Sequence, residues 1–83
     1  PFFVPGGTAV DNRWREELRP YQNAARRVAD DVGAAWIPYQ SVFDEALEEA
    51  PGPYWAADGV HPTPAGHHRM AQAWLSVFRE QVA

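Results

Sequence analysis

Two residues in the C-terminal third of this sequence could together carry out acid–base chemistry. They are Asp58 and His61, three positions apart. A serine nucleophile needs a base to take its proton, and that base needs a carboxylate to fix its tautomer and stabilise the imidazolium ion. Gly59 allows a sharp turn between the two residues, and Pro62 restricts the backbone after His61. One short loop can therefore supply both groups.

The same residues also fit simpler interpretations. Asp-x-x-His alone is compatible with a turn closed by a side-chain hydrogen bond. His61, His67 and His68 could instead be zinc ligands. However, neighbouring positions on a helix point in different directions, and no spacing supplies a convincing third protein ligand. We therefore expect no metal site. Cysteine is absent, which excludes a thiolate site and a disulfide framework.

The tryptophans and the acidic residues have structural interpretations as well. Trp55, shortly before Asp58, could line an acyl or leaving-group pocket or could pack beneath the loop, and the sequence leaves both open. The other tryptophans are expected to be packing residues: Trp14, Trp36 and Trp74. Four acidic residues have helical spacing and are expected to form a solvated face: Asp44, Glu45, Glu48 and Glu49.

The N-terminal part predicts a strand followed by helix. Phe2 to Val4 is typical of the end of a buried strand, and Pro5-Gly6-Gly7 stops it. Asp11 or Asn12 can cap a short helical turn through Leu18. Pro20 then fits the first turn of a longer helix that ends at Gly33. Its apolar stripe consists of Tyr21, Ala24, Ala25, Val28, Ala29 and Val32.

Residues 34–53 predict a second strand and a second helix. The apolar run from Ala34 to Tyr39 is typical of a buried strand. Ser41 and Asp44 resemble a capping box for a helix over residues 42–50, which Pro51-Gly52-Pro53 ends. Strand, helix and strand with a crossover of this length predict a βαβ unit with parallel strands.

The catalytic candidates lie between this region and a last helix. Residues 54–62 are expected to be irregular. Thr63 can cap the last helix, with Pro64 at its first position. The apolar face of this helix consists of Ala71, Trp74, Leu75, Phe78 and Val82. Such a stripe would anchor the loop to the core.

The chain as a whole predicts an incomplete α/β fold. Two parallel strands are too few for an independent sheet, because parallel strands are normally covered on both faces and flanked by others. Eighty-three residues are also fewer than a complete α/β enzyme usually has. The sequence opens inside the apolar run Pro1-Phe2-Phe3-Val4. We expect the remainder of the sheet to precede Pro1.

Residues 54–62, Tyr-Trp-Ala-Ala-Asp-Gly-Val-His-Pro, resemble the last sequence block of SGNH (GDSL-type) hydrolases. The similarity continues through Thr63–His67 and the tryptophan-bearing last helix, and it covers nearly the whole chain. Phe2–Pro5 is similar to the end of a late strand, and Trp14 to Gly33 to the helix after it. The resemblance implies that residues 1–83 are the C-terminal portion of one SGNH domain, a three-layer α/β/α flavodoxin-like sandwich with parallel strands.

The same resemblance implies roles for the residues of the loop. His61 would be the general base and Asp58 the residue that orients it. The nucleophilic serine and the oxyanion-hole donors belong to earlier blocks that are absent here, and the only serines are Ser41 and Ser76. The implied activity is hydrolysis of carboxylic esters, either small acyl or acetyl esters or lipids, without cofactor or metal. The isolated chain would be inactive.

A second hypothesis is a non-catalytic fragment or interaction domain. It would associate through its incomplete sheet with the missing N-terminal part or with another copy of itself. The formal charge of −4, with seven scattered arginines and no lysine, argues against a nucleic-acid partner. No apolar run approaches the roughly 20 residues needed to span a bilayer. A composition of 46% apolar and 22% charged residues is typical of a globular protein.

Overall fold

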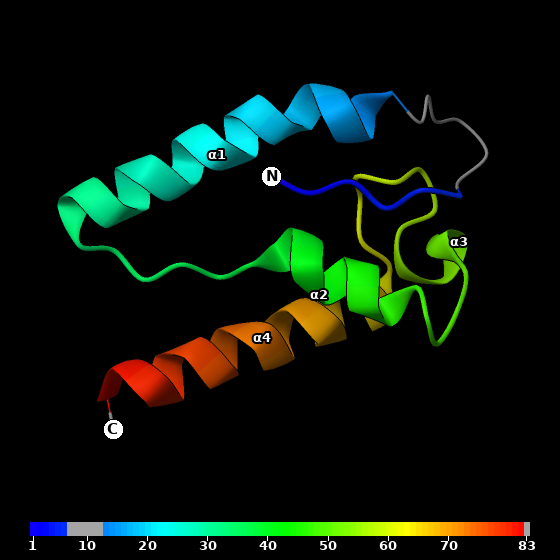
Figure 1. The fold of residues 1–83 in the computed structure, drawn as a ribbon. Coiled ribbons are helices and arrows are strands. Elements are labelled where there is room, and N and C mark those ends of the chain that lie inside the picture. The colour runs from blue at the N-terminus through cyan, green and yellow to red at the C-terminus, as the bar shows by residue number, and fades with distance from the viewer. Residues whose placement is uncertain (7–12, 83) are drawn as a thin grey trace.

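The computed structural model describes residues 1–6 and 13–82, and this part of the chain folds as helices joined by extended segments (Figure 1). The helices are α1 (Trp14–Val32), α2 (Tyr39–Ala46), α3 (Gly52–Trp55) and α4 (Pro64–Val82). Within the described ranges there is no β-strand, and the one β-type pairing is an isolated antiparallel bridge between Ala56 and Pro62. The two predicted strands and the sheet between them are therefore not seen here.

Helix α1 is one helix where the sequence suggested two. Pro20 lies inside it and not at a helix start, so that part of the prediction was wrong. A proline leaves the carbonyl four residues earlier without its N–H partner. Pro20 is exposed, so water can bond that carbonyl. Gly33 ends the helix with φ 71°, as expected, and donates to the carbonyl of Asp30. The predicted caps Asp11 and Asn12 lie outside the described residues.

The N-terminal segment is buried, as predicted, but is not a strand. Phe3 and Val4 are fully buried. The Gln40 side-chain amide bonds both backbone groups of Phe3: its Oε1 accepts from the N–H at 2.8 Å, and its Nε2 donates to the carbonyl at 2.9 Å. The Val4 N–H donates to the Gly59 carbonyl. A side chain and a loop thus take the place of a neighbouring strand.

The prediction of a second strand, from Ala34 to Tyr39, was also wrong. Residues 34–38 have no regular structure, and Tyr39 already belongs to α2. A strand is defined by backbone pairing, and residues 34–38 have no neighbouring strand within the described part of the chain. Trp36 is half-buried, with the Arg26 guanidinium 5.4 Å from the centre of its ring.

Helix α2 begins and ends earlier than predicted. Pro38 occupies its N-cap position without a side-chain cap hydrogen bond, so the capping box of Ser41 and Asp44 was a wrong prediction. The Asp44 carboxylate instead accepts from Gln40 Nε2 at 2.9 Å and from Arg15 at 3.0 Å. The bond from Arg15 connects α2 to the first turn of α1, whereas the bond from Gln40 lies within α2.

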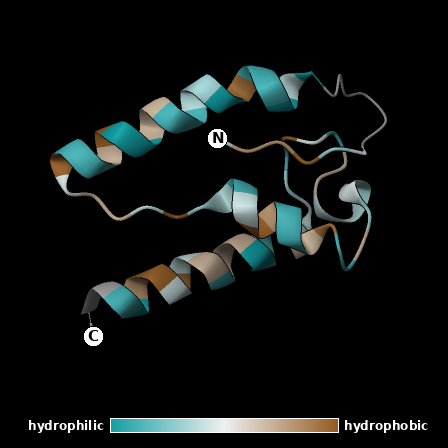
Figure 2. Cartoon of the chain, viewed as in Figure 1, coloured by the Kyte–Doolittle hydropathy of each residue, from teal (hydrophilic) through white to brown (hydrophobic). Residues whose placement is uncertain are grey.

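Helix α4 begins as predicted. The Thr63 hydroxyl accepts the Gly66 N–H at 3.1 Å, which is the N-cap bond, and Pro64 is the first helical residue. Figure 2 marks the hydrophobic residues of α1 and α4 in brown, and several of the large ones are exposed. The most exposed large apolar residues on them are Tyr21, Val28 and Val32 on α1, and Trp74, Leu75 and Phe78 on α4. The rings of Trp74 and Phe78 stack at 5.1 Å.

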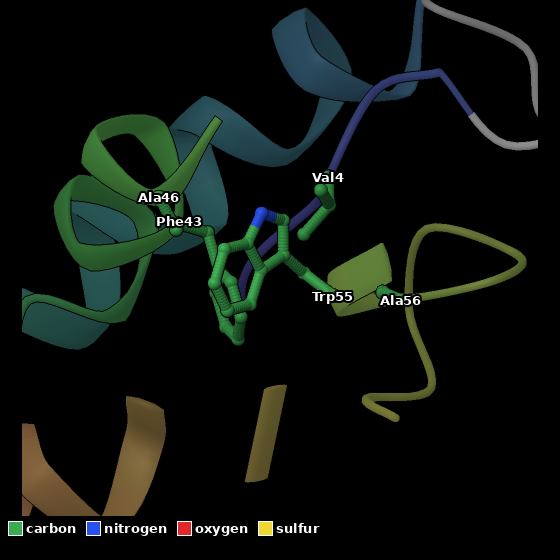
Figure 3. Packing of buried hydrophobic residues seen from close by; sticks show 5 residues of the cluster. All are labelled: Val4, Phe43, Ala46, Trp55 and Ala56. Atoms are coloured by element: carbon green, nitrogen blue, oxygen red, sulfur yellow. The ribbon is translucent and has the colours of Figure 1, made fainter. Parts of the chain in front are cut away.

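A small core joins the N-terminal segment to α2, α3 and the following loop. It consists of Val4, Phe43, Ala46, Trp55 and Ala56 (Figure 3). The N-terminal segment contacts both sides: the Phe2 ring lies 4.6 Å from that of Phe43 on α2, and the Phe3 ring 6.3 Å from that of Trp14 on α1. No helix of the described residues is both long and apolar enough to cross a membrane.

Candidate active site

The loop that follows α3 is closed at its base by backbone bonds. The bridge between Ala56 and Pro62 brings its two ends together. Thr63 N–H donates to the Trp55 carbonyl at 2.8 Å, and Gly59 N–H donates to the Ala56 carbonyl at 3.1 Å. The loop is therefore a compact turn attached to the core on one side and to α4 on the other.

Asp58 and His61 meet on this loop. Nδ1 of His61 lies 2.5 Å from Oδ2 of Asp58. The other carboxylate oxygen, Oδ1, accepts the backbone N–H groups of Val60 at 3.0 Å and of His61 at 2.8 Å. The His61 side chain is 84% exposed and that of Asp58 is 42% exposed. The imidazole is thus fixed on its Nδ1 side and open on the other.

The surroundings of Asp58 favour its charged form. The backbone N–H groups of Val60 and His61, together with the His61 ring, lower the pKa of Asp58 from 3.8 to about 2. Asp58 is therefore a carboxylate at neutral pH and can only accept hydrogen bonds. It follows that His61 Nδ1 carries the hydrogen of their contact. In neutral His61 the lone pair is then on Nε2, the nitrogen turned away from Asp58.

Gly59, between these two residues, packs against the N-terminal segment. Its φ is 90°, a conformation that residues with a Cβ rarely adopt. A Cβ at this position would lie 2.8 Å from Cε1 of Phe3 and 3.0 Å from the carbonyl oxygen of Val4. Only glycine fits here without a shift. The sharp turn expected at Gly59 is present, and the close approach to Phe3 was not foreseen from the sequence.

Trp55 supports the loop from beneath. Its side chain is buried, and its Nε1 donates to the Ala50 carbonyl at 3.0 Å. The Arg69 guanidinium lies 5.0 Å from the centre of its ring and forms an ion pair with Glu49. Of the two interpretations of Trp55, this burial favours packing. The contact between Arg69 and the Trp55 ring could not be predicted from the sequence, because it depends on how α4 crosses α3.

The other candidates are placed elsewhere. His67 and His68 are exposed in the first turns of α4. Among the described residues no group of three His, Cys, Asp or Glu side chains lies close enough to hold a metal ion. Ser41 lies in α2 and Ser76 in α4, both exposed and outside the loop that carries Asp58 and His61.

Two known proteins are similar to this chain. The crystal structure of a GDSL-like lipase from Parabacteroides merdae matches 93% of this chain and 36% of that protein, with a TM-score of 0.88 and 33% identity. An acetylxylan esterase from Geobacillus stearothermophilus is 28% identical over 75 residues, which are 90% of this chain and 33% of the esterase. No family model matches the sequence.

These likenesses place the chain in the SGNH (GDSL-type) hydrolase family, to whose C-terminal part it corresponds. The chain spans about a third of the length of each relative. Its backbone follows that of the lipase closely, whereas the three-layer sandwich remains a prediction, since the described residues contain no strand.

Proposed function

We propose that the protein is a serine esterase and that this chain supplies two members of its catalytic triad, His61 as general base and Asp58 as the residue that orients it. The observation that carries the proposal is the 2.5 Å contact between His61 Nδ1 and Asp58 Oδ2. This contact leaves Nε2 on the exposed side of the ring, where a serine hydroxyl could reach it. The membership of the SGNH family supports the same reaction.

The proposed reaction is a two-step acyl transfer. The serine, which would be outside this chain, loses its proton to His61 Nε2 as its oxygen attacks the ester carbonyl. The imidazolium then gives the proton to the leaving alcohol, and an acyl-enzyme remains. Water attacks the acyl group, with His61 again taking the proton, and the acid is released. Asp58 stays ionised throughout and stabilises the imidazolium.

The proposed substrates are esters of small acyl groups, acetyl among them. The similarity to an acetylxylan esterase supports this choice, and the similarity to a GDSL-like lipase keeps lipid esters as the alternative. Esters of this kind need neither a metal nor a cofactor for their hydrolysis, because the base and the nucleophile supply the chemistry.

The test is fluorophosphonate labelling of the complete gene product, read by peptide mass spectrometry. We expect one serine outside residues 1–83 to be labelled, and His61→Ala to abolish the labelling. His67→Ala is the matched control, because His67 is also exposed but lies on α4, away from Asp58. Undiminished labelling of His61→Ala would contradict the proposal.

A second candidate is an interaction domain without catalysis. The exposed apolar faces of α1 and α4 favour it, since contiguous apolar surface of this kind is typical of interfaces. These helix faces, and not a sheet edge, would make the contact. Self-association of the gene product in a sedimentation experiment, together with absent fluorophosphonate labelling, would support this second hypothesis over the esterase.

A further inference from the structure

The side-chain amide of Gln40, on α2, has a partner for each hydrogen bond that it can form. Its Oε1 accepts the N–H of Phe3 at 2.8 Å and Nε2 of Gln22 at 3.1 Å. Its Nε2 donates to the Phe3 carbonyl at 2.9 Å and to Oδ1 of Asp44 at 2.9 Å. An amide offers two lone pairs and two N–H groups, so all of them are used. Gln40 is therefore held in one orientation against the backbone of Phe3.

The carboxylate of Asp44 determines which way this amide faces. A carboxylate only accepts hydrogen bonds, so the nitrogen of Gln40, and not its oxygen, must face Asp44. Arg15 holds the other carboxylate oxygen of Asp44 at 3.0 Å. With its nitrogen fixed, Gln40 presents its oxygen to the N–H of Phe3. A reversed amide would place N–H against N–H and oxygen against oxygen at Phe3.

The bonds to Phe3 set which side of the N-terminal segment faces the loop of the candidate active site. In extended backbone the N–H and carbonyl of one residue point to the same side, and those of the next residue point to the opposite side. Gln40 bonds both groups of Phe3, which turns the N–H of Val4 the other way. That N–H donates to the Gly59 carbonyl at 2.9 Å. A shift of the segment by one residue would break this bond to the loop.

Close packing also couples the segment to the loop. A Cβ on Gly59 would lie 3.0 Å from the Val4 carbonyl oxygen, and a Cβ on Gly52 would collide with the Pro5 carbonyl. Val4 is fully buried in the same cluster as Ala56, where the loop begins (Figure 3). Since these contacts leave no gap, a displacement of the segment should displace the loop with it.

We infer that Gln40 is a positioning residue of the proposed esterase: by fixing the backbone of Phe3, it places the loop so that Nε2 of His61 is within reach of the serine. It acts through Phe3, Val4 and Gly59 and not by contact with the substrate. This role rests on the proposed function, whereas the coupling of Gln40 to Val4 can be measured without catalysis.

The pair of Asp58 and His61 should move with the loop as a unit. Asp58 accepts the N–H groups of Val60 and His61 and contacts the His61 ring, so its partners all belong to the loop. Loss of Gln40 should therefore change where His61 lies relative to the serine. The pKa of Asp58 should stay at about 2, because its bonds within the loop persist.

The first test is the rate of amide hydrogen exchange at Val4 in the complete gene product, measured by NMR. Gln40→Met keeps about the length of the side chain and removes the amide. We expect the Val4 N–H, which does not bond Gln40, to exchange about tenfold faster, the effect of losing one or two hydrogen bonds. Gln40→Ala is a second variant: it leaves space in which water can bond the Phe3 backbone, so it should fold.

The matched control is Gln22→Met, the same substitution at a neighbouring glutamine. Gln22 donates to Gln40 and to the Pro1 carbonyl, but it does not bond Phe3. Its loss leaves both bonds between Gln40 and Phe3 in place, so Val4 exchange should keep the rate of the parent protein.

The second test is the hydrolysis of p-nitrophenyl acetate by the same proteins. We expect Gln40→Met and Gln40→Ala to lower kcat at least about tenfold with KM retained, because a misplaced base slows the reaction without weakening substrate binding. The NMR titration midpoint of the Asp58 carboxyl carbon should match that of the parent protein. A purely structural loss would instead reduce the melting temperature and kcat of Gln22→Met as well.

The outcomes separate this inference from the proposed function. Unchanged Val4 exchange or unchanged kcat in both Gln40 variants would overturn the inference. An equal fall of kcat in Gln22→Met would overturn it too, and so would a rise of KM at constant kcat. Faster Val4 exchange in the Gln40 variants of a protein that hydrolyses no ester would contradict the esterase and support the coupling of Gln40 to the loop.

Discussion

The backbone N–H of Val4 donates to the carbonyl of Gly59 at 2.9 Å, which ties the loop between Asp58 and His61 to the N-terminal segment of the chain. Val4 is fully buried and Gly59 is buried. The geometry of the proposed acid–base pair therefore depends on a contact with a distant part of the sequence, and not on the loop alone.

Gly59→Ala should displace this loop. The new Cβ would lie 3.0 Å from the Val4 carbonyl oxygen, a backbone atom that cannot rotate away, and the φ of 90° would be strained. We expect a loss of about 1–3 kcal/mol in the free energy of unfolding, measured by urea denaturation. We also expect slower fluorophosphonate labelling, since the base would move.

The control for this substitution is Gly33→Ala. Gly33 also has a positive φ, 71°, but a Cβ there would meet nothing within 4 Å. It should lose stability by about 1 kcal/mol through backbone strain alone and keep its labelling rate. Equal effects of the two substitutions on labelling would show that packing at Gly59 does not position the loop.

Thr63 is expected to stabilise the loop that carries Asp58 and His61, because its hydroxyl bonds residues on both sides of that loop. Its hydroxyl accepts the Gly66 N–H as an N-cap and lies 2.6 Å from the Tyr54 carbonyl, to which it donates. Thr63→Ala should therefore lower the free energy of unfolding by at least about 1 kcal/mol, the usual cost of a lost cap. Thr63→Ser keeps the hydroxyl and should retain most of the stability. Equal losses in the two variants would show that the hydroxyl has no such role.

The local features of the site were predictable because they depend on neighbouring residues. The Thr63 cap, the helix end at Gly33 and the turn at Gly59 each follow from the preference of one residue for one backbone conformation. The resemblance to the family was also local, because residues 54–62 that carry it form one contiguous block of sequence. The pairing of Asp58 with His61 spans only one turn of chain.

The wrong predictions concern partners distant in the sequence. Phe3 was expected in a strand, but whether buried extended backbone becomes a strand depends on what pairs with it, and here Gln40 does. Asp44 was expected to form a capping box with Ser41, yet its carboxylate accepts hydrogen bonds from Arg15 and Gln40 instead. Pro20 was placed at a helix start because its missing N–H costs little there, and the sequence does not show that its position inside α1 is exposed.

The charge on Asp58 should persist in acid. Its pKa of about 2 is below the ordinary 3.8, because the backbone N–H groups of Val60 and His61 bond the carboxylate. A depressed pKa adds stability above the ordinary value, and this contribution is lost as the pH falls through the folded pKa. The stability advantage over Asp58→Asn should thus be constant above about pH 5 and shrink between about pH 4 and 2. The measurement is an NMR titration of the Asp58 carboxyl carbon. A midpoint near pH 3.8 would contradict the prediction.

The roles of Asp58 and His61 can be separated by kinetics on the complete gene product. His61→Ala should lower kcat for a small acetyl ester by roughly 10³-fold or more, because no base remains for the serine proton. The melting temperature should barely change, since the His61 side chain is 84% exposed. Asp58→Asn keeps the shape but can present an amide N–H to Nδ1, which favours the tautomer with its lone pair facing Asp58. That variant should also be severely impaired, with KM largely retained. Near-normal turnover by His61→Ala would rule out this mechanism.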